Sequence, residues 1–282
     1  MLKRILFSAV WLLMSVFVFH QQAVAQVMNI NDDDFLTMVK GDDEVSPLAD
    51  SLFTRYVLSL QRVSERNQIS AVRQLMSCAS RYPAYYEQWM RLCHRRLYEE
   101  MDTVCYDAIY LKILRRALAD SLLTEVSKER CRYYERLLQQ HAPGSTLRDF
   151  VVNLREGGEV RLRRLLERKP AVLFFFDPSC IRCQLLMSRL RSEKTLLRAV
   201  NEGEVQMFAV CVSEDLPFWE TIKNDFPSSW RVALLSESEH PSEKNASIFD
   251  RFPMLLLVDA KQRVLLKNPT LYEFSQRLNR SK

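Results

Sequence analysis

Cys180 and Cys183 are the residues whose type and spacing point most directly to chemistry, because they form a Cys-x-x-Cys pair just after an apolar run. Such a pair can contribute half of a zinc site, close a structural disulfide or act as a redox dithiol. Zinc takes about four ligands, and the sequence has no second Cys-x-x-Cys and no His-x-x-x-His. A disulfide across so short a loop would add little stability. The pair therefore favours redox chemistry, with no metal.

The flanking sequence supports this interpretation. Residues 171–176 are apolar at every position, which predicts a strand buried on both faces, and a helix-type run follows from Cys180 to about residue 200. Unpaired backbone N–H groups and the dipole at a helix N-terminus stabilise a thiolate, the reactive form of cysteine. Arg182 favours the thiolate of Cys180 by its charge and Asp177 opposes it. We therefore expect a reactive dithiol that these two charged residues tune.

The rest of the C-terminal half alternates strands with helices. The Gly157-Gly158 pair predicts a hairpin between 150–154 and 160–162. Further strands are expected at 205–212, 232–235, 254–258 and 264–266, and further helices at 216–226, 242–249 and 271–278. This order predicts an α/β domain over residues 143–282, with a mixed central sheet flanked by helices.

The N-terminal half differs from this domain in its composition and in the spacing of its apolar residues. Two basic residues, an apolar run over 5–19 and small residues at 23 and 25 predict a secretory signal peptide over residues 1–25. Residues 26–44 are rich in aspartate, and we expect an acidic, flexible lead-in. Residues 45–142 contain no glycine and carry apolar residues at helical spacing, which predicts an all-helical domain of four or five helices.

Composition excludes several classes of protein. Only five glycines are present, and neither a dinucleotide-binding G-x-G-x-x-G, a phosphate-binding G-x-x-x-x-G-K-[ST] nor a G-x-S-x-G nucleophile elbow occurs. The formal net charge of +5 is too small to indicate nucleic-acid binding. No small-molecule cofactor is expected.

The chain resembles thioredoxin-like proteins, and among them the TlpA/ResA-like envelope group. The resemblance covers about residues 144–282 and is carried by the hairpin, by the sequence LFFFDPSCIRC and by the sequence RFPMLLL at 251–257. The last segment is similar to the strand that opens with the family's cis-proline, here Pro253. The preceding helical segment, with the sequence DTVCY at 102–106, resembles an uncharacterised helical domain of envelope proteins from Gram-negative anaerobes.

The resemblance implies a mechanism and a setting. Cys180 would attack a substrate disulfide and Cys183 would resolve the mixed disulfide. A cis peptide bond before Pro253 would expose the backbone of Phe252 to a substrate strand. The implied partners are a protein disulfide and a membrane or envelope thiol donor, and the helical domain could mediate a homodimer. With the leader, this predicts a soluble protein exported to the periplasm of a Gram-negative bacterium.

Three departures from the family pattern leave a second hypothesis open. Ser179 stands where a tryptophan usually precedes the first cysteine, and Phe174 and Leu186 stand where relatives carry proton-relay carboxylates. Asp177 and Glu214 are candidate substitutes. The alternative is a non-catalytic binding module on a thioredoxin fold. A peroxidase-type relative would carry a threonine before its nucleophilic cysteine, and none precedes Cys180 nearby.

The other five cysteines are not expected to belong to the dithiol site. Cys211 falls within an apolar run and is predicted to be a buried core thiol. The remaining four lie in the helical segment, where they could stay free or pair in three ways: Cys78, Cys93, Cys105 and Cys131.

Overall fold

The computed structural model describes residues 27–40, 47–61, 63–99, 106–213, 215–239, 249 and 251–279. It divides into two compact units, one comprising Met1–Glu99 with Ala108–Cys131 and the other Glu100–Asp107 with Arg132–Lys282. The division falls inside the last helix before the sheet, whereas the sequence led us to expect a boundary between residues 142 and 143.

The first unit is helical, as expected. Its described elements are α2 (Asp32–Val39), α3 (Pro47–Gln61), α4 (Glu65–Ser80), α5 (Pro83–His94), the π-helix η1 (Arg95–Glu99), α6 (Asp107–Leu118) and the first half of α7 (Glu125–Gln139), which continues into the second unit. Their apolar faces bury large side chains, among them Trp89, Tyr86 and Tyr110. Helix packing rather than any loop therefore supplies the core of this unit.

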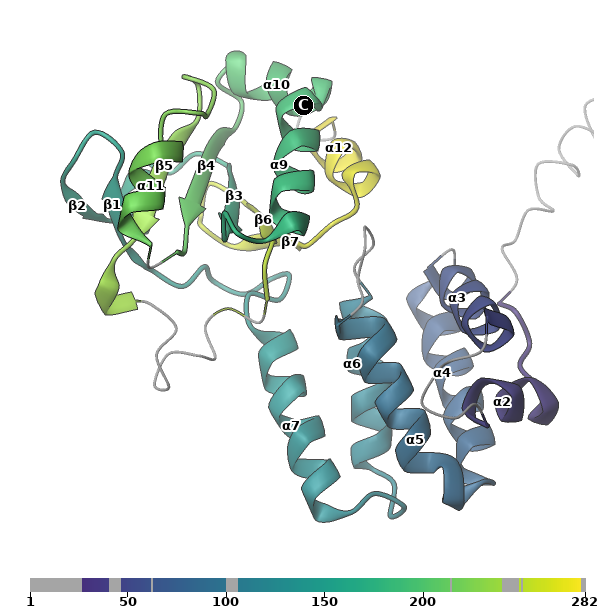
Figure 1. Ribbon diagram of the computed structural model, residues 1–282. Coiled ribbons are helices and arrows are strands. Elements are labelled where there is room, and N and C mark those ends of the chain that lie inside the picture. The colour runs from purple at the N-terminus through teal and green to yellow at the C-terminus, as the bar shows by residue number, and fades with distance from the viewer. Residues whose placement is uncertain are drawn as a thin grey trace, which may run out of the picture. The chain divides into compact units, whose positions relative to one another are not determined.

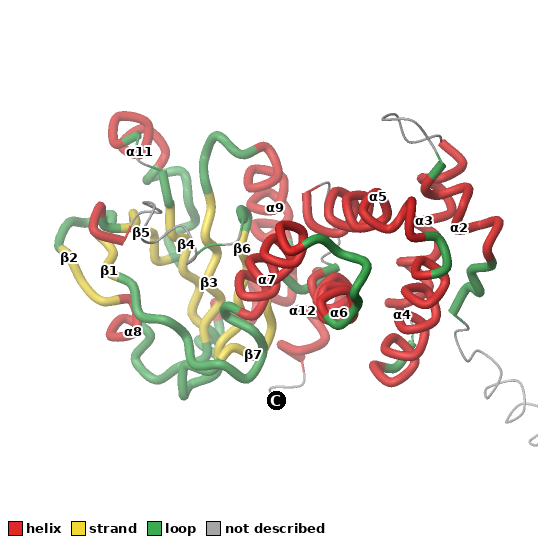
Figure 2. Tube along the Cα trace, turned by 90° about the horizontal axis from the view of Figure 1, so that it is seen from below, coloured by secondary structure: helices red, strands yellow, loops and turns green. Residues whose placement is uncertain are grey.

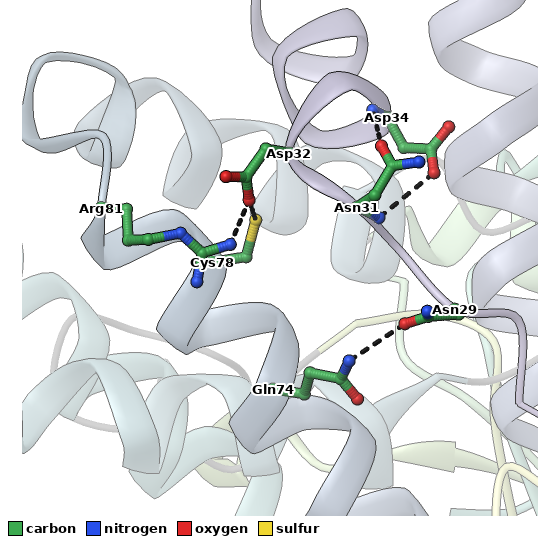
Figure 3. Close-up of polar contacts among 7 residues, drawn as sticks. All are labelled: Asn29, Asn31, Asp32, Asp34, Gln74, Cys78 and Arg81. Atoms are coloured by element: carbon green, nitrogen blue, oxygen red, sulfur yellow. Dashed lines mark hydrogen bonds and ion pairs between the residues drawn. The ribbon is translucent and has the colours of Figure 1, made fainter.

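The expected flexible lead-in over residues 26–44 is wrong for α2. Asn31 caps this helix by accepting the Asp34 N–H at 2.8 Å, and the Asp34 carboxylate accepts the Asn31 N–H in return. Figure 3 shows this reciprocal pair. The aspartates that looked like a solvated tail are instead favourable in a first helical turn, where the dipole attracts negative charge.

Polar contacts and one aromatic side chain hold α2 in place. Asp32 forms an ion pair with Arg81 and accepts a hydrogen bond from the Cys78 thiol at 3.1 Å (Figure 3). Burial, followed by this contact with Asp32, raises the pKa of Cys78 to about 11, so Cys78 stays a neutral thiol. Phe35 is fully buried, with its ring 5.5 Å from that of Trp89. The helix is therefore part of the core of its unit.

The second unit is built on a seven-stranded mixed sheet with the order β2-β1-β5-β4-β3-β6-β7 (Figure 1). The strands are β1 (Val151–Leu154), β2 (Glu159–Arg161), β3 (Ala171–Phe176), β4 (Gln206–Cys211), β5 (Arg231–Leu235), β6 (Met254–Val258) and β7 (Val264–Lys267). β3, β4 and β5 run parallel to one another, and every other neighbouring pair is antiparallel. The predicted mixed sheet is confirmed.

Helices cover both faces of this sheet. They are α8 (Leu162–Leu165), α9 (Ile181–Ser192), α10 (Lys194–Asn201), α11 (Leu216–Ile222), the 3-10 turn η2 (Glu237–Glu239) and α12 (Leu271–Asn279). In Figure 2, α9 and α11 lie on one side of the strands and α8 on the other. β3 sits between two apolar clusters, since Phe174 and Phe176 join the cluster under α9 and Phe175 joins the other. This confirms the strand predicted to be buried on both faces.

The hairpin forms as the sequence predicts, whereas one predicted helix is divided in two. β1 and β2 pair across Gly157 and Gly158, whose φ angles of +97° and +93° favour glycine. The single helix expected over 180–200 is instead two, α9 and α10, which break at Glu193. The Glu193 carboxylate accepts the Leu196 N–H at 2.6 Å and so begins a new helix without glycine or proline.

Some sequence predictions concern residues outside the described part of the chain. They are the signal peptide over 1–25, the motif at 102–105 with Cys105, the candidate carboxylate Glu214 and nearly all of the helix expected over 242–249. Among the helices that the structure describes, none has both the length and the apolar content needed to cross a membrane.

Replacing Phe35 by alanine should destabilise the helical unit by about 3–5 kcal/mol, because it removes a fully buried aromatic ring and leaves a cavity. Urea unfolding followed by circular dichroism measures this change. Leu48→Ala is the control, since Leu48 in α3 is 62% exposed and its loss should change stability by less than about 0.5 kcal/mol. Equal stability of Phe35→Ala and wild type would show that α2 is not part of the core.

Candidate functional site

Cys180 occupies the first position of the site, as the N-cap of α9. Its backbone N–H donates to the Asp177 carbonyl at 3.1 Å, which closes the turn that leaves β3. Its sulfur accepts the backbone N–H of Cys183 at 3.3 Å. The sulfur thus takes the place of a capping oxygen and lies where the unpaired N–H groups and dipole of α9 favour negative charge. The predicted helix start at the dithiol is confirmed.

The Phe252–Pro253 peptide bond is cis, as the resemblance implied. The bond immediately precedes β6, the antiparallel neighbour of β3. The Phe252 carbonyl oxygen lies 3.9 Å from the Cys180 sulfur, within the range of a weak S–H···O contact. Phe252 and Pro253 are both partly exposed. The structure therefore brings together Cys180, Cys183, Phe252 and Pro253, four residues that are far apart in two segments of the sequence.

The two thiols have different environments. Cys180 is partly exposed, whereas Cys183 is 1% exposed and belongs to the cluster beneath α9. Burial raises the pKa of the Cys183 thiol well above its ordinary value, and its contact with Cys180 adds to the increase. A hydrogen bond with the backbone of Asp177 opposes these effects, while the Asp177 charge reinforces them. When the pair is reduced, Cys183 therefore stays protonated at neutral pH.

The loop between β3 and α9 is fixed by side-chain contacts. The Asp177 carboxylate accepts the Ser179 N–H at 2.8 Å and the Ser179 hydroxyl at 2.7 Å. The Gln184 amide donates to the Pro178 carbonyl at 2.8 Å. Sequence reasoning gave Gln184 no role, although a glutamine in the first turn of a helix is a common partner of the preceding loop. Asp177 thus fixes the loop that leads to Cys180 through its hydrogen bonds with Ser179.

The remaining sequence candidates can also be located. Arg182 lies in the first turn of α9 and is half-buried. Phe174 is fully buried and Leu186 packs against the same cluster as Cys183. The two positions at which the resemblance led us to look for a carboxylate are therefore occupied by apolar side chains in or against the cluster that contains Cys183.

Exposed apolar side chains lie on the two helices that start at this edge of the sheet. Four large apolar side chains of α9 and α11 are more than 40% exposed: Ile181, Leu185, Leu216 and Phe218. Both helices begin at the carboxyl ends of parallel strands, α9 after β3 and α11 after β4. In open α/β sheets, ligands bind beyond these carboxyl ends. The sequence does not reveal this grouping, because the strand order decides which helices begin at the same edge of the sheet.

The other described cysteines are buried. Cys211 is fully buried in β4, and burial raises its pKa to about 12, which confirms the predicted core thiol. Cys78, Cys93 and Cys131 are buried as well. Burial raises the pKa of Cys93 as well.

Exposure and thiol pKa together predict which cysteine reacts first. Brief treatment of the reduced protein with iodoacetamide at neutral pH should label Cys180 at least tenfold faster than Cys183 or Cys211, because the latter two are buried and protonated. Mass spectrometry of the digested protein measures the label at each cysteine, and the same treatment in denaturant provides the control for intrinsic reactivity. Equal labelling of Cys180 and Cys211 in the folded protein would contradict the site geometry.

Comparisons with known proteins bear on the fold. No protein-family model and no curated protein matches the chain. A crystal structure of a thioredoxin-like protein from Bacteroides caccae matches with a TM-score of 0.73 at 20% identity, over 92% of this chain and 97% of that one.

Two further solved structures match about half of this chain. The C-terminal domain of an uncharacterised Bacteroides fragilis protein gives 24% identity and a TM-score of 0.45, over 49% of this chain and 98% of that one. The thioredoxin domain of a Bacteroides vulgatus thiol-disulfide oxidoreductase gives 19% identity and a TM-score of 0.41, over 48% of this chain and 96% of that one. On the strength of the Bacteroides caccae match and the sheet order above, this chain has a thioredoxin-like fold with a helical region ahead of the sheet domain.

Proposed function

We propose that the protein is a thiol-disulfide oxidoreductase that reduces or interchanges protein disulfides through Cys180 and Cys183. The observation that carries the proposal is the arrangement of the two sulfurs. Cys180 caps α9 and accepts the Cys183 N–H, and it is partly exposed, whereas Cys183 is buried one turn further along the helix. One thiol is thus placed to attack a substrate and the other to attack only the first.

The reaction proceeds in two exchanges. The Cys180 thiolate attacks one sulfur of the substrate disulfide, which forms a mixed disulfide and releases the other substrate sulfur as a thiolate that takes up a proton. Cys183 then loses its proton and attacks the Cys180 sulfur, which releases the second substrate thiol. Two electrons have passed to the substrate, and the protein holds a Cys180–Cys183 disulfide. An external thiol donor must reduce this disulfide before the next cycle.

Phe252 and Pro253 are the proposed substrate-binding residues. The Phe252 carbonyl lies beside the Cys180 sulfur, so a substrate strand that pairs with this backbone would bring its disulfide to the dithiol. Arg182 and Asp177 are the proposed tuning residues, because both charges are adjacent to the dithiol in sequence and Asp177 also contacts the loop that carries Cys180.

The setting of the reaction is also a proposal. The leader-like sequence over residues 1–25 supports export, and an exported compartment such as the periplasm is where protein disulfides persist. The thiol donor would then be a membrane or envelope protein. Association of two copies through the helical unit is proposed on the size of that unit alone.

A non-catalytic binding module remains the second candidate, and specific residues favour it. Phe174 and Leu186 offer no carboxylate to accept the Cys183 proton, and Ser179 replaces the usual tryptophan. The two candidates differ in whether the dithiol turns over, which is directly measurable.

Insulin reduction in the presence of dithiothreitol should be accelerated by the wild-type protein and fall to background in Cys180→Ser, because the attacking thiolate is lost. Cys183→Ser should instead accumulate a mixed disulfide with the substrate, visible by mass spectrometry. Cys211→Ser is the matched control, since Cys211 is a buried thiol outside the pair. Wild-type protein no faster than Cys180→Ser would favour the binding module.

The second exchange should be strongly pH-dependent. After Cys180 reacts with an aromatic disulfide reagent, release of the second chromophore reports attack by Cys183. Its pKa is raised, so the reactive thiolate becomes more abundant as pH rises, and the rate should increase about tenfold per pH unit from 7 to 9. A plateau in this range would show that Cys183 ionises at an ordinary pH.

In the same assay, Asp177→Asn tests whether the Asp177 carboxylate raises the pKa of Cys183 or accepts its proton. The Asp177 charge raises the pKa of Cys183, so its removal should speed the second release severalfold. A slower second release would mean that Asp177 accepts the Cys183 proton. Asp33→Asn, in α2, controls for the general loss of one negative charge.

A further inference from the structure

A pocket of about 520 Å³ lies at the carboxyl end of β5. Its exposed apolar side chain is that of Leu216 of α11, and the buried Leu234 and Leu235 of β5 also border it. Glu159 of β2 and Glu237 just beyond β5 add two carboxylates. The pocket therefore combines apolar side chains with negative charge. It contains neither cysteine of the dithiol, and it shares Leu216 with the exposed apolar residues described above.

Strand register places the pocket at the same edge of the sheet as the dithiol. Phe176 of β3 lies opposite Cys211 of β4, which lies opposite Leu234 of β5, and the three strands are parallel. Cys180 follows β3, Leu216 follows β4, and the pocket lies at the end of β5. Neighbouring strands are separated by about 4.8 Å, so the end of β5 is about 10 Å from the end of β3. In Figure 1 these strands follow one another in this order.

The two carboxylates have no cationic partner among the residues that the structure describes. Glu159 accepts a hydrogen bond from the Ser236 hydroxyl at 3.1 Å, and both glutamate side chains are exposed. By contrast, Glu156 on the same hairpin forms an ion pair with Arg155. The pocket is thus negatively charged and complementary to a positive group with an apolar stem, which describes lysine and arginine.

We propose that this pocket binds a lysine or arginine side chain of the substrate protein, about three residues from the cysteine that Cys180 attacks. The proposal rests on the oxidoreductase function proposed above. An extended chain advances about 3.3 Å per residue, so three residues span the distance of about 10 Å between the strand ends. The aliphatic stem lies against Leu216, and the charged end lies between Glu159 and Glu237.

Matched peptide substrates test the proposal. Each peptide carries one cysteine in a disulfide with the same small thiol, and lysine, glutamine or glutamate stands two, three or four residues from it on either side. At one of these positions we expect kcat/KM for the lysine peptide to exceed that for the glutamate peptide by about fivefold, a difference that two exposed charge pairs can produce. At high salt the two kcat/KM values should become nearly equal, because salt screens these charges.

Variants connect the preference to the pocket. The double variant Glu159→Gln/Glu237→Gln should abolish the lysine preference, whereas Glu156→Gln should retain it, because Glu156 does not line the pocket. Hydroxyethyl disulfide, which has no flanking residues, should be reduced equally by all three proteins. This substrate shows that the variants remain folded and that their dithiol is active.

The outcomes separate the two proposals. Equal rates for the lysine, glutamine and glutamate peptides, with hydroxyethyl disulfide still reduced, would overturn the pocket assignment and leave the oxidoreductase function standing. A lysine preference that survives in the double variant would also overturn the assignment. Failure to reduce any disulfide would overturn the proposed function and the pocket with it.

Discussion

Strand β3 has no face open to water, because all six of its residues are buried between two apolar clusters. A strand packed on both faces cannot slip by one residue without exchanging its two sets of side chains. Its register with β4 and β6 is therefore fixed, and so is the point at which the chain leaves it. From Asp177 a short hydrogen-bonded turn leads directly to Cys180 at the start of α9. The cis bond before Pro253 begins the neighbouring strand and brings Phe252 to the same sulfur.

This arrangement makes the two thiols unequal. Cys180 lies at a helix start, partly exposed and in contact with backbone N–H, while Cys183 points into the cluster that anchors α9. Phe174 belongs to that cluster and Leu186 packs against it, so neither position offers Cys183 a carboxylate. In the proposed cycle the first exchange is consequently the easy one, and release of the substrate waits for deprotonation of Cys183. In that cycle the mixed disulfide persists until Cys183 loses its proton, so contacts with the substrate beyond the dithiol would contribute to recognition.

The sequence predicted well the features that are local or strongly apolar. Few other structures share the sequence patterns of three features: the apolar run at 171–176, the glycine pair of the hairpin and the dithiol at a helix start. Helix α2 was missed because three aspartates dominated its composition, although Phe35, Met38 and Val39 have helical spacing and Asn31 with Asp34 forms a capping box. The break at Glu193 was missed because a side-chain cap, not glycine or proline, begins α10. The pocket at Glu159 and Glu237 could not be predicted, since it depends on the pairing of β1 with β5, which brings the hairpin that carries Glu159 to the end of β5.

The central claim is that Cys180 and Cys183 form a reversible redox pair. Equilibration of the protein in glutathione buffers of graded ratio, followed by acid quenching and mass spectrometry, tests it most directly. The account predicts one transition in which a disulfide forms between these two cysteines, with the two-electron slope of about 30 mV per tenfold change in the ratio of oxidised to reduced protein. If both thiols stay reduced across the whole range, or pair with other cysteines, the claim is contradicted.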